Sequence, residues 1–126
     1  MSEIVTVNGD DFAGSGRLDG LTINVSLKGN ADYSALDAVE MLLTRAHAEA
    51  QRAGTKETVV DLRQLEFMNS SCFQSFVAWI NDINELAEGQ RYKVKFLSNP
   101  NLHWQKRSLH SLRSFAVELV TIVETQ

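Results

Sequence analysis

The chain has 126 residues, a net charge of −4, 44% hydrophobic residues and 22% charged residues. These values are typical of one globular domain with its own hydrophobic core. The acidic balance argues against general affinity for nucleic acid or membrane, and no apolar run is long enough to span a bilayer. The single cysteine and the absence of signal-peptide features in residues 1–5 predict a cytoplasmic protein.

The first quarter of the chain is predicted to form strands. β-prone side chains alternate over residues 3–7, and a weaker strand pattern covers residues 12–18. These patterns predict two strands within an N-terminal extension, residues 1–20. Asp19-Gly20 is a hairpin dipeptide, and it precedes a strand over residues 21–28 whose apolar face starts at Leu21. We therefore expect an antiparallel start to the sheet.

Strands and helices alternate over the rest of the chain. A helix capped by Asp32 or Ser34 is expected to end at Gly54. A strand over 57–62 follows, in which adjacent Val59 and Val60 indicate burial on both faces. Further predictions are a helix from Ser70 to about residue 86, a strand over 92–97, a helix over 102–114 with Phe115 facing inward, and a strand over 117–123.

This order of elements predicts the fold class. Alternating strands and helices indicate an α/β layered domain with a central mixed β-sheet and helices, formed by residues 1–126 as a single domain. No Gly-rich phosphate loop, nucleophile elbow or spaced set of metal ligands occurs. We therefore predict no enzyme activity, no metal and no cofactor.

Residues 61–73 join the predicted strand to the second helix. Ser70 and Ser71 lie where that helix begins, and a serine there can cap the free backbone N–H groups. The same N–H groups and the helix dipole would accept a phosphate. The segment therefore supports two roles, helix capping and reversible phosphorylation.

The same segment resembles the signature of STAS domains, the family of sulfate transporters and anti-sigma factor antagonists. The resemblance lies in Val59-Val60-Asp61-Leu62 and in Leu65-Glu66-Phe67-Met68-Asn69-Ser70-Ser71. Asn69 replaces the family's usual Asp, and Cys72 replaces its usual Gly. The resemblance implies a STAS-like fold and places the family's phosphoacceptor, the first hydroxyl of the pair, at Ser70. It also matches Asp32 to an acidic residue near the phosphorylation site.

The resemblance implies a partner-switching regulator of the anti-sigma factor antagonist kind. The expected partners are a serine kinase of the histidine-kinase-like ATPase superfamily and a metal-dependent serine phosphatase. The expected partner-binding residues are Asp32, Asn69, Ser70, Ser71, Cys72 and Trp79. Ser71 is expected to turn toward packing, while Ser70 projects outward. A non-switching STAS scaffold and a small-ligand module stay open as alternatives, and so does a homodimer.

Two of these residues have a structural alternative. Cys72 is either a thiol activated by the helix N-terminus or a small side chain packed near the cap. Trp79 lies beside the apolar stripe of its helix, so it either faces a partner or fills the gap between helix and sheet. The basic side of the third helix, Lys106, Arg107 and Arg113, is most simply a solvated face.

Overall fold

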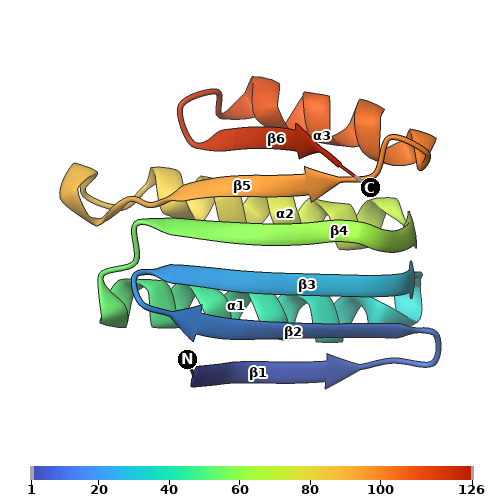
Figure 1. The fold of residues 1–126 in the computed structure, drawn as a ribbon, viewed down its shortest axis with the longest axis horizontal. Helices are drawn as coiled ribbons and strands as arrows, with labels where there is room; N and C mark the ends of the chain where they lie inside the picture. Colours follow the sequence, from blue (N-terminus) through green and yellow to red (C-terminus); the bar gives the residue numbers. More distant parts are fainter. Residues whose placement is uncertain (1, 126) are drawn as a thin grey trace.

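The computed structural model describes residues 2–125 as a six-stranded mixed sheet with helices packed against it, as the sequence predicts (Figure 1). In chain order the elements are β1 (Ser2–Asn8), β2 (Phe12–Asp19), β3 (Thr22–Ala31), η1 (Tyr33–Ala35), α1 (Leu36–Ala53), β4 (Glu57–Met68), α2 (Ser70–Asn84), η2 (Glu88–Gln90), β5 (Lys93–Ser98), α3 (His103–Phe115) and β6 (Val120–Glu124).

The strands lie side by side in chain order. β1, β2 and β3 form an antiparallel meander, and β3 through β6 run parallel to one another. Parallel neighbours require a crossover, and α1, α2 and α3 supply these connections. The carboxyl ends of β3 and β4 therefore lie at the same edge of the sheet, where η1 and α2 begin.

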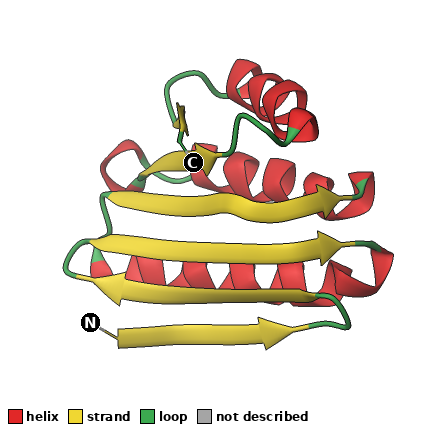
Figure 2. Ribbon diagram, turned by 45° about the vertical axis from the view of Figure 1, so that its right-hand side comes forward, coloured by secondary structure: helices red, strands yellow, loops and turns green. Residues whose placement is uncertain are grey.

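Helices α1 and α2 cover one face of the sheet, and α3 packs beside β5 and β6 (Figures 1 and 2). In β3 the side chains facing the helices are buried, and the alternate ones are exposed. No helix of residues 2–125 covers the opposite face. Val60 is accordingly buried and Val59 only half-buried, so the prediction of burial on both faces is wrong.

Two glycines make the turns that the sequence predicts. Gly20 closes the β2–β3 hairpin with a φ of 66°, and Gly54 ends α1 with a φ of 68°. Both angles lie in the left-handed region, which side chains with a Cβ atom rarely adopt. These two turns fix where β3 and β4 begin relative to each other.

Several boundaries differ from the predictions. β4 continues through residues 63–68, which were expected to form a loop, and α2 ends at Asn84 rather than near residue 86. Leu21 lies in the hairpin turn and is exposed instead of starting the buried face. Phe115 is 51% exposed because it is the last residue of α3, where the chain turns away at Ala116. Within residues 2–125, no helix is long and apolar enough to cross a membrane.

Candidate functional site at the junction of β4 and α2

The second half of β4 has only one neighbouring strand. β5 pairs with β4 from Glu57 to Asp61 and then separates, whereas β3 stays paired with β4 as far as Met68. Two register shifts in the β3–β4 ladder allow β4 to bulge along this stretch. The backbone carbonyls on the β5 side of this stretch therefore need other hydrogen-bond partners.

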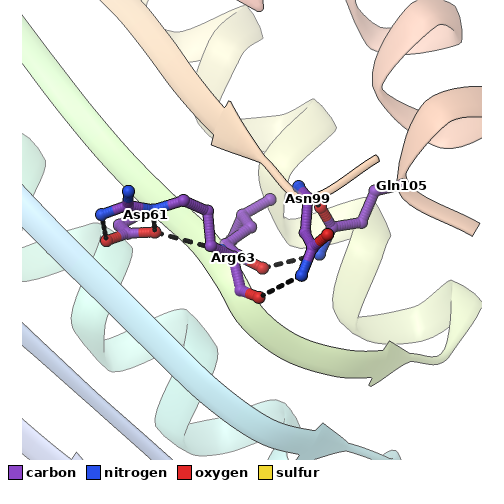
Figure 3. Close-up of polar contacts among 5 residues, drawn as sticks. Asp61, Arg63, Asn99 and Gln105 are labelled. Carbon is purple, nitrogen blue, oxygen red and sulfur yellow. Dashed lines mark hydrogen bonds and ion pairs between the residues drawn. The ribbon is translucent and has the colours of Figure 1, made fainter. Parts of the chain in front are cut away.

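Side chains from the β5–α3 region supply those partners (Figure 3). The buried Gln105 amide donates to the carbonyls of Leu62 and Leu65 at 2.6 and 3.0 Å. Asn99 Nδ2 donates to the carbonyl of Arg63 at 3.2 Å, and Trp104 Nε1 donates to that of Leu65 at 3.2 Å. These bonds hold the strand that leads into α2.

Asp61 and Arg63 form an ion pair on the same strand (Figure 3). The Arg63 guanidinium donates from Nε to Oδ1 at 2.9 Å and from Nη2 to Oδ2 at 2.8 Å. The Arg63 backbone N–H also donates to Oδ1, at 3.0 Å. The hydrogen bonds from Arg63 hold the pKa of the Asp61 carboxyl below its usual range. The pair fixes the start of the bulged stretch and is only partly exposed.

Asn69 caps α2. Its side-chain Oδ1 accepts from the Cys72 N–H at 2.9 Å, and its carbonyl accepts from the Phe73 N–H at 3.0 Å. Its own N–H donates to the carbonyl of Ala31 at 2.9 Å, which ties the cap to the end of β3. The expectation that Ser70 or Ser71 caps the helix is therefore wrong, because the residue before them already does so.

Ser70 and Ser71 are the first two residues of α2, and both are exposed. The prediction that Ser71 turns toward packing is therefore wrong, because the first buried residue of the helix is Cys72. Neither hydroxyl has a hydrogen-bond partner within residues 2–125, and neither do the two backbone N–H groups at these positions. With no acidic residue in the first turn of α2, this end of the helix is suited to an anion.

Asp32 lies next to this helix start, at the end of β3. Its Oδ1 accepts from the backbone N–H of Ser34 at 3.0 Å and from the Ser34 hydroxyl, so Asp32 caps η1, the short helix before α1. Its backbone carbonyl accepts from the Cys72 thiol at 3.3 Å. The structure therefore brings Asp32, Asn69 and Cys72 together with the two serines.

The packed interpretation of Cys72 is the one that the structure supports. The side chain is 0% exposed. Burial, and then the carboxylates of Asp32 and Glu40, raise the pKa of the Cys72 thiol. A protonated, buried thiol is neither a nucleophile nor a contact for a partner, so the side chain of Cys72 does not belong to the binding surface.

Trp79 also belongs to the core. It is 3% exposed, and its Nε1 donates to the Tyr92 hydroxyl at 2.9 Å. The expectation of an exposed partner contact at Trp79 is therefore wrong, because Tyr92 on the neighbouring segment gives the indole N–H a buried acceptor. The alternative, that Trp79 fills the gap between helix and sheet, holds.

Two exposed aromatic side chains near the serines were missed by the sequence analysis. Tyr33 in η1 is 71% exposed, and Phe67, two residues before the Asn69 cap, is 47% exposed. Asn30 and Phe67 are paired in the β3–β4 ladder, so η1 follows directly beside this part of β4. The sequence did contain a signal for this surface: Tyr33 and Phe67 each lie three residues before a helix, α1 and α2 respectively. Exposed aromatic side chains are typical of protein interfaces.

Solved structures share this fold, and three of them are described below, while no family model and no curated protein matches the sequence. An anti-sigma factor antagonist from Mycobacterium paratuberculosis matches with a TM-score of 0.66 and 16% identity, covering 90% of this chain and 88% of that one. A chain in the complex of the diguanylate cyclase SiaD with its activator SiaC from Pseudomonas aeruginosa gives 0.68 and 11% identity, with coverage of 96% and 99%. SiaC of Pseudomonas aeruginosa gives 0.59 and 16%, with coverage of 99% and 100%.

Proposed function

We propose that this chain, which has the STAS-like fold of an anti-sigma factor antagonist, is a partner-switching regulator controlled by phosphorylation of Ser70. Unmodified, it binds a serine kinase of the histidine-kinase-like ATPase superfamily, and that kinase phosphorylates it. A metal-dependent serine phosphatase removes the phosphate. The observation that carries the proposal is the exposed, unpaired Ser70 hydroxyl at the first position of α2. The chain itself supplies no catalysis in this scheme.

The surroundings of Ser70 favour a stable phosphoserine. Transfer of the ATP γ-phosphoryl group to Ser70 Oγ adds about −1.5 to −2 charges at neutral pH. The unpaired N–H groups of Ser70 and Ser71 and the positive end of the α2 dipole lie beside that charge. Asn69 is neutral, so it does not repel the phosphate as the family's usual Asp would. We therefore expect the modified chain to keep its fold.

The effect on the partner follows from the same charge. Tyr33 and Phe67 provide exposed aromatic surface near Ser70, and a partner covering them would also cover the serine hydroxyl. A phosphate in an interface that fits a neutral hydroxyl would be removed from water, which is costly. Phosphorylation would therefore release the kinase without rearranging the regulator.

Ser70 is chosen over Ser71 on the resemblance alone, since both side chains are exposed. The test is coexpression with a serine kinase of the histidine-kinase-like ATPase superfamily from the same organism, followed by intact mass and phosphopeptide mapping. We expect one added phosphate, on Ser70, lost in Ser70→Ala and retained in Ser71→Ala. Phosphate on Ser71 alone, or none with an active kinase, would contradict the proposal.

A diguanylate cyclase is a second candidate for the downstream partner. The observation that favours it is the match to the complex of SiaD with its activator SiaC, which spans nearly the whole of both chains. In that case the unmodified chain would bind the cyclase instead of an anti-sigma factor. A pull-down with purified cyclase and purified kinase, using Ser70→Ala and Ser70→Asp as baits, separates the two outputs.

A further inference from the structure

A groove of about 320 Å³ runs between α1 and α2, and Ser70 does not line it. Both helices follow parallel strands, so they run in the same direction and present matching positions to each other. The polar groups that line the groove come from both helices: Glu40, Thr44 and His47 from α1, and Ser75 and Asp82 from α2. No lysine or arginine lines it.

The two carboxylates give the groove an acidic group at each end. Asp82 and His47 line the same groove, and the charge of Asp82 opposes the fall in the pKa of His47 that burial causes. Glu40 precedes His47 by two helical turns, which places these two residues about 10 Å apart along α1. Neither carboxylate forms an ion pair within residues 2–125.

A buried hydrogen-bond chain keeps His47 neutral beside these carboxylates. The Trp79 indole can only donate, so the Tyr92 oxygen accepts from it at 2.9 Å. The Tyr92 proton is then directed to His47 Nδ1, 2.6 Å away. Protonating Nδ1 would leave the buried Tyr92 hydroxyl proton without an acceptor, and burial also lowers the pKa of His47. His47 therefore adds no positive charge to the groove.

Helix α3 carries the complementary charges. Lys106 and Arg113 are exposed and seven positions apart, so they lie on one side of the helix, about 10 Å from each other along its axis. Residues 98–117 contain no Asp or Glu, although the whole chain is acidic. Neither Lys106 nor Arg113 forms an ion pair within residues 2–125.

We propose that the α1–α2 groove binds helix α3 of a second copy of this chain. Arg113 would pair with Glu40 and Lys106 with Asp82, because one acidic group lies toward each end of the groove and one basic group lies toward each end of α3. This direction is antiparallel to α1, which also aligns the helix dipoles favourably.

The contact joins two different surfaces, so it is head-to-tail, and each copy keeps one free groove and one free helix. Exposed ion pairs contribute little individually, so we expect weak association that grows with concentration and disappears in about 0.5 M salt, where the Debye length is about 4 Å. Ser70 lies in neither surface. The proposal therefore stands or falls independently of the phosphorylation switch.

The test is sedimentation velocity of the full chain over a concentration series at low salt. We expect the weight-average sedimentation coefficient of the wild type to rise with concentration. A groove variant, Glu40→Lys with Asp82→Lys, and a helix variant, Lys106→Glu with Arg113→Glu, should each stay monomeric. Their equimolar mixture should associate again, because each variant then offers the charge that the other lacks.

The matched control reverses two cations on the open face of the sheet, Arg17→Glu with Lys28→Glu, and changes the net charge as much as the helix variant does. It should associate like the wild type at equal salt. Circular dichroism melts confirm that every variant is folded. A wild type that stays monomeric at all concentrations, reversal variants that still associate, or a mixture that does not would each overturn the proposal.

Discussion

The two crossover connections that follow β3 and β4 both begin with a capped helix, but they use their serines differently. At the end of β3, Asp32 caps η1, and its carboxylate holds both the backbone N–H and the hydroxyl of Ser34. At the end of β4, Asn69 caps α2 through the Cys72 N–H, which lies beyond the serines. The first crossover therefore uses its serine to complete a cap, whereas the second leaves Ser70 and Ser71 unused. Capping and modification need not compete for one side chain when a neighbouring residue does the capping.

The largest expected effect tests whether the free hydroxyl is the regulated one. Ser70→Asp places a carboxylate where phosphate would be, and it should weaken binding to the kinase by about 2–4 kcal/mol, or roughly 30- to 1000-fold. Ser34→Ala, at the corresponding serine of the other crossover, should bind the kinase like the wild type. Isothermal titration calorimetry measures both. Equal affinities for Ser70→Asp and the wild type would show that Ser70, like Ser34, does not control binding to the kinase.

The second-largest expected effect concerns Cys72, because its thiol links α2 to Asp32 at the start of the other crossover. Cys72→Gly removes a buried thiol and its bond to the Asp32 carbonyl, and it adds backbone freedom in the first turn of α2. We expect a loss of about 2–3 kcal/mol in the free energy of unfolding, and about 1 kcal/mol for Cys72→Ala, which keeps the Cβ atom. Urea titrations measure both values. No difference between the two variants would mean that the thiol packing, not the backbone, sets the cost.

The two caps should differ in strength. Asn69→Ala deletes the cap of a long helix and should cost about 1 kcal/mol, while Asp32→Ala, which caps one turn, should cost about 0.5 kcal/mol. Asn69→Asp keeps an acceptor at the helix start and should retain the stability of the wild type. The comparison would fail if Asp32→Ala proved the more destabilising variant in thermal melts corrected to one reference temperature.

The smallest effect is a pH dependence at the same junction. The pKa of Cys72 is raised above its ordinary value of 9.0 in the folded chain, so the folded chain keeps the thiol proton to a higher pH than the unfolded chain does. Above pH 9.0 the unfolded chain therefore binds fewer protons, and the free energy of unfolding falls as the pH rises. This fall should be shallower in Cys72→Ala. Tyr92, whose pKa is also raised, contributes equally to both proteins.

The local parts of this site were predictable from the sequence, and the long-range parts were not. The turns at Gly20 and Gly54 and the start of α2 follow from residues close in sequence, and the nearness of Asp32 to the serines follows from the family resemblance. The extension of β4 to Met68 does not, because its carbonyls find partners on Asn99 and Gln105, about 40 residues later. The burial of Trp79 likewise depends on Tyr92, an acceptor on another element.

The amide and indole groups that satisfy the late carbonyls of β4 also protect the domain from aggregation. A strand whose outer carbonyls are free is a template for pairing with a strand from another molecule. Here Gln105 and Trp104 occupy the positions that an incoming strand would need, and they do so from a helix that is itself packed on the sheet. The segment before Ser70 can therefore stay extended with a neighbouring strand on only one side, without pairing with a β-strand of another molecule.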